Sequence, residues 1–266
     1  MPFYNAEAYL AEALISVLNQ TFSDFELILI NDASTDGSDE VVKKYLGDAR
    51  VKYLKNQVNQ GIVFNLNLAL KIAAADLIAR MDGDDISDLS RFAKQYDFLQ
   101  QHPQVTAVGS FVKIIDEQGK VIDQRTKPVD FKEMKKRLLV YSPVVHASLM
   151  YRKKDILAVG GYRDKYLYCE DLDLFYRLVY AGYTLANIPE FLYQYRYHSG
   201  SVAHRSRLLA QRLFNLRVET INNFKLKVSF LQKLMIFGQY LVGISLSGRA
   251  RQTVEGLYKK IFYHAK

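Results

Sequence analysis

The 266-residue sequence has few features of an extracellular or membrane-spanning protein. Its single cysteine, Cys169, excludes an intrachain disulfide and favours a reducing compartment. The opening residues, MPFYN, show no basic segment followed by an apolar one, so they predict no signal peptide. The most apolar run of the C-terminal region, residues 234–248, is about fifteen residues long, whereas a bilayer span needs ~20. We therefore predict a cytoplasmic protein.

Composition excludes a disordered chain, because 49% of the residues are hydrophobic and 24% are charged, as in ordinary globular proteins. The net charge of +8 is unevenly distributed. Residues 200–266 contain twelve Lys or Arg against two acids, a net charge of +10, so residues 1–199 carry −2. No nucleic-acid recognition motif accompanies the basic residues, and we predict no nucleic-acid partner.

Apolar runs of strand type alternate with helical segments in the first half of the chain. Residues 25–31 (FELILIN) and 76–81 predict buried strands, and Asn5 suits the start of a helix. This alternation predicts an α/β fold, Rossmann-like, with a mostly parallel sheet flanked by helices. Ligands of such sheets bind beyond the carboxyl ends of the strands, so residues 31–37 and 81–85 should face one crevice.

Three carboxylates, those of Asp82, Asp84 and Asp85, follow the second strand within four positions. Carboxylates this close repel one another unless a cation or hydrogen-bond donors neutralise them. The cluster could be the solvated face of a loop, but its place after a buried strand favours a divalent metal site. Hard oxygen ligands suit Mg²⁺ or Mn²⁺ that also holds a phosphate. An EF-hand is excluded, since that loop needs a Gly at its sixth position and a distant Glu.

Five other side chains are candidates for a site. Asp32 ends a strand, and either caps the following turn or accepts a hydrogen bond from a base or ribose. Tyr4 precedes a helix at the same sheet edge and could stack on a base. Glu170 and Asp171 begin a helix, where acids are favourable in any case, but a carboxylate beside a metal site can also serve as a general base. His198 can be explained as a satisfied histidine of the core or surface.

In their order along the chain, seven segments resemble the motifs of the family 2 glycosyltransferases. These segments are MPFYNAEAYLAEALISVLNQTF, ELILINDASTDGS, NQGIVFNLNLAL, ADLIARMDGDDIS, HPQVTAVGS, GGYRDKYLYCEDLDLFYRL and YRYHSGSVA. They cover about residues 1–203. The resemblance implies the A-type glycosyltransferase fold, a single Rossmann-like domain that binds a nucleotide sugar, in an enzyme of bacterial cell-envelope or polysaccharide synthesis.

The resemblance also implies which residues bind the donor. The nucleotide-binding residues would be Pro2, Tyr4, Asp32 and Asp82. Tyr4 and Asp32 would hold the base, and Asp82 the ribose side of the nucleotide. Asp84 would bind a Mn²⁺ or Mg²⁺ ion that bridges the diphosphate, with His198 as an additional ligand. The family's commonest donors are UDP-sugars, so the resemblance implies a UDP-sugar here.

On the acceptor side, the resemblance implies that Asp171 takes the proton from the attacking hydroxyl and that Glu170 contacts the acceptor. A single displacement from the side opposite the diphosphate inverts the anomeric centre. The acceptor would be a saccharide or a lipid-linked saccharide. Processive synthases of the family carry a QxxRW motif, and this chain contains no Trp, so we predict the addition of a single sugar.

Two further departures from the family's pattern concern the fold and the donor site. The family's apolar first strand is missing before Phe3, which predicts a gap in the sheet and poor stability unless apolar residues precede Met1. Leu66 stands where many relatives carry an Arg.

Two rival functions use the same residues differently. A nucleotidyltransferase would normally show a Gly-rich phosphate loop with a basic residue near the N-terminus, and FYNAEAYL contains neither. The chain could also be an inactive homologue that acts as a binding subunit. Loss of catalysis would be expected to remove at least one of Asp82, Asp84 and Asp171, and all three are present.

The last region, residues 204–266, predicts a basic helical segment after the catalytic domain of residues 1–203. Basic residues flank its apolar run, namely Lys225, Lys227, Lys233, Arg249, Arg251, Lys259 and Lys260. This pattern predicts a helix in the interface of an anionic membrane, at the inner face of the cell membrane, where it would serve a lipid-linked acceptor. The alternative is that the helices pack back on the catalytic domain and the basic residues are solvated.

Overall fold

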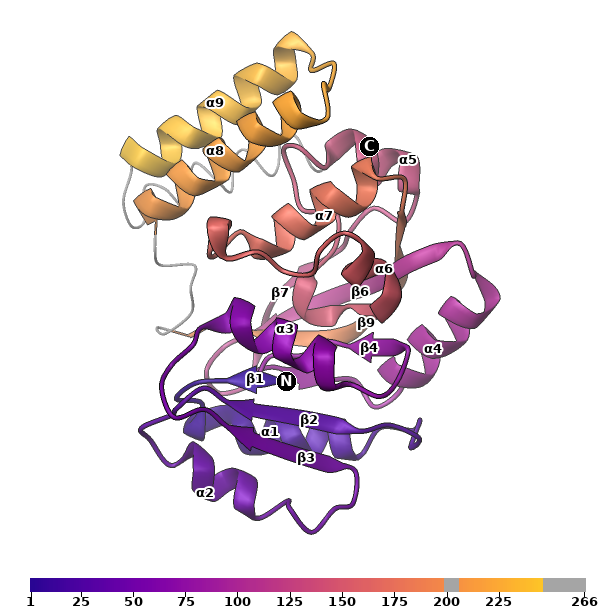
Figure 1. The fold of residues 1–266 in the computed structure, drawn as a ribbon, viewed down its shortest axis with the longest axis vertical. Coiled ribbons are helices and arrows are strands. Elements are labelled where there is room, and N and C mark those ends of the chain that lie inside the picture. Colours follow the sequence, from indigo (N-terminus) through magenta and orange to yellow (C-terminus); the bar gives the residue numbers. More distant parts are fainter. Residues whose placement is uncertain (199–205, 246–266) are drawn as a thin grey trace.

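The computed structural model describes residues 1–198 and 206–245 (Figure 1). Three parallel strands form the first sheet in the order β1 (Pro2–Phe3), β2 (Leu27–Asn31) and β3 (Val51–Lys55). Three helices belong to this part of the chain: α1 (Glu7–Leu18), α2 (Ser38–Lys43) and α3 (Ile62–Ile72). Every residue of β2 is buried, because helices cover both faces of the strand. Leu27 and Leu29 pack with α1, whereas Ile28 and Ile30 pack with α3.

The second sheet has six strands and is mixed. Its order is β4 (Leu77–Ala79), β8 (Met150–Arg152), β6 (Val105–Ile115), β9 (Thr184–Arg196) and β5 (Ile86–Ser87), with β7 (Val121–Arg125) paired to β6. Strands β6 and β9 pair in parallel, and the other pairs of this sheet are antiparallel. The predicted α/β fold with a parallel sheet flanked by helices is confirmed. The antiparallel strands make the six-stranded sheet less regular than the sequence pattern indicates.

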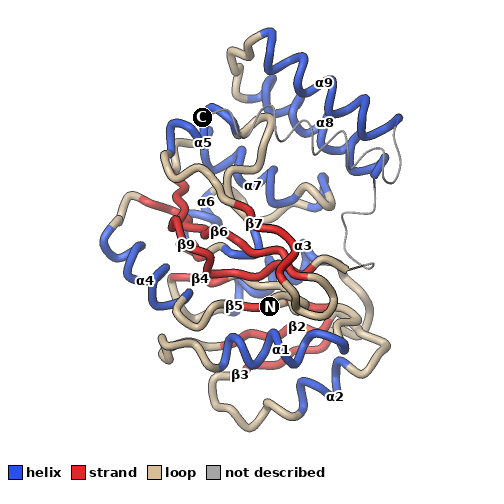
Figure 2. The backbone as a smooth tube through the Cα atoms, turned by 180° about the vertical axis from the view of Figure 1, so that it is seen from behind, coloured by secondary structure: helices blue, strands red, loops and turns tan. Residues whose placement is uncertain are grey.

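The remaining helices cover this second sheet or extend from it (Figure 2). They are α4 (Arg91–Gln101), α5 (Phe131–Arg137), α6 (Lys153–Ala158), α7 (Glu170–Tyr180), α8 (Ser206–Asn223) and α9 (Phe230–Ser245), with short 3₁₀ turns η1 (His146–Ser148) and η2 (Asp164–Tyr166). Leu66, at the position where many relatives carry an Arg, is 3% exposed and packs in the core with α7.

An apolar cavity of about 360 Å³ lies between the two sheets. Its lining includes Phe25 and Ile28 on one side, and Ile78 and Phe92 on the other. In the described sheets, β1 and β4 are the edge strands that face this space. Of the first strand, Pro2 and Phe3 are paired with β2 as β1, so the expected gain in stability from apolar residues before Met1 stays a prediction.

Helices α8 and α9 form a hairpin at the end of the molecule away from the first sheet (Figure 1). One side of the hairpin packs on the domain, since Leu216, Met235 and Ile236 belong to its main core. Residues 206–245 therefore pack against the catalytic domain on one side, whereas contact of this region with a membrane stays a prediction. The proposed boundary at residue 203 and the basic residues after Ser245 lie outside the described residues. Within the described ranges, none of the helices has the length and apolar character needed to cross a membrane.

Candidate active site

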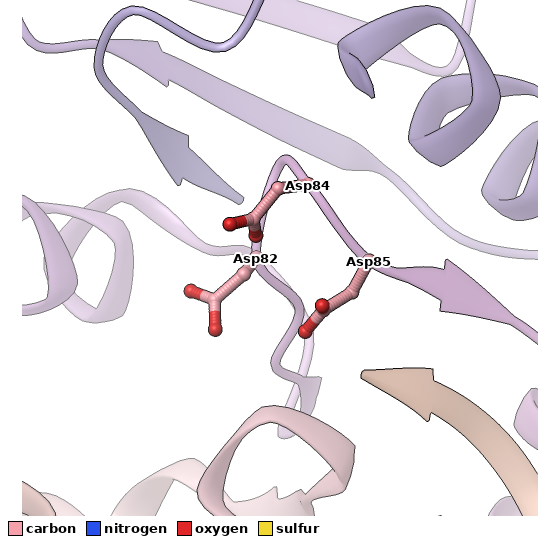
Figure 3. A group of neighbouring side chains, drawn as sticks. All are labelled: Asp82, Asp84 and Asp85. Carbon is pink, nitrogen blue, oxygen red and sulfur yellow. The ribbon is translucent and has the colours of Figure 1, made fainter. Parts of the chain in front are cut away.

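The loop that follows β4 carries the three predicted carboxylates. Asp82, Asp84 and Asp85 each offer an oxygen, and these oxygens lie within 4.8 Å of one another (Figure 3). Gly83 allows this loop to approach β1 closely, because a Cβ atom at this position would lie 2.9 Å from the Cβ of Phe3. The sequence therefore places the acids correctly, at the end of a strand and beside the first sheet.

Asp85 differs from its two neighbours because it is buried, with 1% of its surface exposed. Its Oδ2 accepts a hydrogen bond from the Tyr193 hydroxyl at 2.8 Å, and its Oδ1 accepts one from the Arg196 backbone N–H at 2.7 Å. Burial, reinforced by the charges of Asp84 and Asp82, raises the pKa of Asp85 well above its ordinary value. Asp85 therefore ties the carboxylate loop to β9.

Asp84 lies beside His198, which follows the end of β9. The Nε2 atom of His198 is 2.9 Å from Oδ2 of Asp84, and the imidazole ring also contacts the ring of Tyr9 at 5.2 Å between centroids. Two neighbouring ligands of an octahedral Mg²⁺ or Mn²⁺ ion are roughly 3 Å apart, since each lies about 2.1 Å from the ion. In the structure this contact is a hydrogen bond, and its length is also the spacing expected for two ligands of one divalent cation, so the assignment of Asp84 and His198 as metal ligands stays a prediction.

Asp82 is paired with Arg80, a residue that the sequence analysis did not select. The Arg80 side chain is 8% exposed and donates to the Asp82 carboxylate. Burial raises the pKa of Asp82, although the charge of Arg80 opposes this effect. A basic residue inside the apolar run LIARM was the available signal for Arg80, since a buried charge is costly unless it is paired.

Glu170 and Asp171 form the first turn of α7. Burial, together with the charge of Asp171, raises the pKa of Glu170 to about 7. The Oε2 atom of Glu170 is buried, and no hydrogen bond reaches it from the described part of the chain. Burial also raises the pKa of Asp171. The hydrogen bond of 2.7 Å that its Oδ1 accepts from the Leu172 N–H acts in the opposite direction and lowers the pKa. The charge of Arg80 opposes the rise in the pKa of both carboxyl groups.

Asp32 holds the loop between β3 and α3. Its Oδ1 accepts hydrogen bonds from the Gln60 N–H at 2.8 Å and from the Asn56 amide at 2.7 Å, while its Oδ2 accepts one from the Gly61 N–H at 2.8 Å. Burial alone would raise the pKa of Asp32, but the hydrogen bonds outweigh it and lower the pKa. Asp32 is 4% exposed, and these hydrogen bonds position the loop between β3 and α3 at the edge of the sheet.

The two other predicted nucleotide-binding residues belong to β1 and the turn after it. Pro2 is buried in β1, opposite Ile30 of β2. Tyr4 is 49% exposed, so its ring is available for stacking. Tyr4 and Asp32 directly follow the neighbouring strands β1 and β2, so they lie at one edge of the sheet, as the sequence predicted for Tyr4, and their roles in nucleotide binding stay predictions.

Arg196 is a second residue that the sequence analysis missed. It is 2% exposed, and its Nε donates to the backbone oxygen of Asp84 at 2.9 Å. Its Nη1 donates to the backbone oxygens of Asp116 and Glu117 at 3.2 Å. Arg196 thus fixes the backbone of the proposed metal ligand against the turn between β6 and β7.

Acidic side chains gathered beyond the strand ends of an α/β domain mark the place where such domains bind their ligands. A model of the glycosyl transferase family 2 matches residues 1–160, and the chain belongs to this family. It is therefore a glycosyltransferase, and this finding favours that hypothesis over the nucleotidyltransferase alternative.

Relatives with assigned names are also glycosyltransferases. The putative glycosyltransferase EpsE of Bacillus subtilis is 35% identical over 77% of this chain and 74% of its own length. The O-antigen biosynthesis glycosyltransferase WbnJ of Escherichia coli is 33% identical over 76% of this chain and 79% of its own.

Solved structures show the same fold at low sequence identity. TarS of S. aureus, in complex with UDP-GlcNAc, aligns with a TM-score of 0.63 and 20% identity over 91% of this chain and 80% of that structure. The mannosyltransferase PcManGT of Pyrobaculum calidifontis, in complex with GDP-Man and Mn²⁺, aligns with a TM-score of 0.64 and 16% identity over 98% and 79%. The likeness establishes the A-type glycosyltransferase fold for this chain.

Proposed function

We propose that this glycosyltransferase is inverting and metal-dependent, and that it moves a single sugar from a UDP-sugar to a hydroxyl group of a saccharide or lipid-linked saccharide. The observation that carries the proposal is the carboxylate loop itself: Asp82, Asp84 and Asp85 each place an oxygen within 4.8 Å of the others, and Nε2 of His198 lies 2.9 Å from Asp84. The half-buried acids Glu170 and Asp171 at the start of α7, whose pKa values are raised by burial, are the candidate groups on the acceptor side.

The donor would lie along the edge shared by β1, β2 and the carboxylate loop. Tyr4 would stack on the base, with Pro2 and Asp32 beside it, and Asp82 would contact the ribose side. A cation held by Asp84 and His198 would, when bound, neutralise negative charge on the diphosphate. The TarS complex with UDP-GlcNAc and the mannosyltransferase complex with GDP-Man and Mn²⁺ support a nucleotide sugar and a divalent cation as the ligands of this fold.

The reaction would be a single displacement. The acceptor oxygen forms a bond to the anomeric carbon, while the bond from that carbon to the diphosphate oxygen breaks and its electron pair leaves with the diphosphate. Asp171 takes the proton of the attacking hydroxyl, and Glu170 contacts the acceptor. A raised pKa makes a carboxylate a stronger base near neutral pH, which supports this assignment for the start of α7.

The biological setting would be the synthesis of cell-surface glycans at the inner face of the cell membrane. Named relatives support this part of the proposal: one is an amylovoran biosynthesis glycosyltransferase of Erwinia amylovora, and another is a galactosyltransferase of Escherichia coli whose name specifies a diphosphoundecaprenol-linked substrate. A lipid-linked acceptor would require the enzyme to approach a membrane.

A panel of nucleotide sugars with Mn²⁺ tests the proposal. We expect one UDP-sugar to raise the melting temperature and to release UDP slowly by hydrolysis, and we expect EDTA to abolish both effects. Release of a nucleoside diphosphate would be measured by a coupled assay. If no nucleotide sugar binds, or if EDTA changes neither binding nor hydrolysis, the proposed metal-dependent reaction is wrong.

A further inference from the structure

Helix α9 exposes a continuous apolar face, which we call the α9 stripe. Four of its members, Phe230, Leu234, Phe237 and Leu241, are spaced three or four positions apart and so share one side of the helix, and Leu231 lies next to Phe230 at the edge of this face. Their exposed fractions run from 82% for Phe230 to 41% for Leu241. A contiguous row of exposed apolar side chains on an outer helix is a feature of surfaces that bind a partner protein or a membrane.

The opposite side of α9 is committed to the rest of the protein, which fixes the orientation of the stripe. Met235 and Ile236 are buried in the main core. Gly243 lies so close to α8 that a Cβ atom there would be 2.3 Å from the Cβ of Ala210. Helix α9 is the outer member of the hairpin in both views of the molecule (Figures 1 and 2). The stripe is therefore held outward by close helix packing.

Positive charge lies at the N-terminal end of the stripe. Lys225 and Lys227 are exposed in the turn before α9, and Lys233 is exposed on α9 itself. The sequence has no Asp or Glu between Glu219 and Glu255. A surface that combines a large apolar face with exposed lysines is complementary to an anionic lipid surface, in which the headgroups are negative and the acyl boundary is apolar.

We propose that the α9 stripe docks the enzyme on anionic lipid, with α9 parallel to the membrane plane and its lysines on the headgroups. A second copy of this chain is a less favourable occupant, because between Glu219 and Glu255 it offers no carboxylate to pair with these lysines, whereas anionic headgroups do. The inference deepens the proposed function and rests on it for the lipid-linked acceptor. Vesicle binding is measured without donor or acceptor, so failure of docking and failure of sugar transfer are distinguishable.

The absence of Trp from the chain provides a direct reporter. A single Trp introduced by Phe237→Trp would keep the aromatic anchor. We expect its fluorescence to shift to shorter wavelength, and to be quenched by brominated acyl chains, when vesicles of phosphatidylcholine with phosphatidylglycerol are added. The matched control is Leu157→Trp, because Leu157 on α6 and Phe237 are both 50% exposed. We expect no shift for the control.

Substitutions then test the two contributions in the full chain. Leu234→Gln with Phe237→Gln should weaken vesicle binding about tenfold or more, since each side chain loses its apolar partner. Replacement of the three lysines by Gln should weaken it about fivefold for each charge at low salt. The control Leu157→Gln with Leu89→Gln, at sites of 50% and 52% exposure, should bind as the unsubstituted chain does. Melting curves would show that each variant is folded.

Each of three results would overturn the proposal. The first is recovery of the unsubstituted chain in the supernatant after centrifugation with anionic vesicles, together with an oligomeric state that differs between the unsubstituted chain and the stripe variants. That outcome would assign the stripe to contact between copies. The second is equal binding of the stripe variants and the control. The third is equal binding to purely zwitterionic and anionic vesicles, which would exclude the lysines from docking.

Discussion

Replacement of Glu170 by Gln should make the protein more stable at high pH, because the surroundings of the Glu170 carboxyl group disfavour its ionised form. Burial and the neighbouring Asp171 raise the pKa of Glu170 from an ordinary 4.5 to about 7. Its Oε2 receives no hydrogen bond from the described residues. The folded chain therefore keeps a proton on Glu170 between these two pH values, whereas the unfolded chain has lost it.

The size of the effect follows from the two pKa values. Each unit of pKa corresponds to about 1.4 kcal/mol, and partial exposure of the side chain reduces the total to about 2 to 3 kcal/mol. The sign is that of a raised carboxyl pKa: stability is fully present below pH 4.5 and is lost as the pH rises through about 7. Gln carries no charge at any pH, so the variant lacks this loss.

Urea unfolding of both proteins at pH 4.5 and pH 8.5, with EDTA present, measures the effect. We expect the free energy of unfolding of Glu170→Gln, relative to the unsubstituted chain, to rise by about 2 to 3 kcal/mol between the two pH values. This comparison cancels any constant cost of burying the amide. The control is Asp164→Asn at an exposed position in η2, which should show no such rise. Equal pH dependence of Glu170→Gln and the unsubstituted chain would refute the reasoning.

Three further predictions concern the loop, the metal and the sheet edge. Gly83→Ala should lower the melting temperature and weaken donor binding together, because the new Cβ would lie 2.9 Å from the Cβ of Phe3; an unchanged melting curve would contradict the close approach. Asp84→Asn should abolish the Mn²⁺-dependent part of donor binding in calorimetry, since a neutral amide is a poor ligand for a hard cation; unchanged Mn²⁺ dependence would exclude Asp84 as the ligand. Five apolar residues added before Met1 should raise the melting temperature by filling the cavity between β2 and β4, whereas five Gly or Ser residues should not; no difference between the two extensions would count against the prediction.

The positions of the acids at the strand ends could be predicted from the sequence, because the apolar runs before Asp32 and Asp82 are strong local signals. The separate environment of Asp85 could not. Asp85 is held by the Tyr193 hydroxyl and the backbone of Arg196, partners more than a hundred residues away in the chain. Only the fold brings such residues together, so the sequence does not distinguish Asp85 from the rest of the cluster, whereas the family resemblance assigns roles to Asp82 and Asp84.

Local rules also failed where tertiary contacts decide the conformation. Asn5 was predicted to begin a helix, but Ala6 is the residue before α1 and Asn5 has a positive φ of 49°. Its Oδ1 instead accepts a hydrogen bond from the Thr35 N–H at 2.8 Å. The mixed pairing of the second sheet was likewise hidden, because β5 has two residues and β8 has three, too few to show a periodic pattern.

The central claim, that Asp171 takes the acceptor's proton in a metal-dependent sugar transfer, is tested most directly by comparing donor binding with turnover in Asp171→Asn. With the UDP-sugar identified by the panel and Mn²⁺ present, calorimetry should give the same donor affinity for the variant as for the unsubstituted chain. Single-turnover transfer to the acceptor, or to water in its absence, should fall by about two to four orders of magnitude, the usual scale for a lost general base. Transfer at the unsubstituted rate, or a loss of donor affinity with normal turnover, would contradict the account.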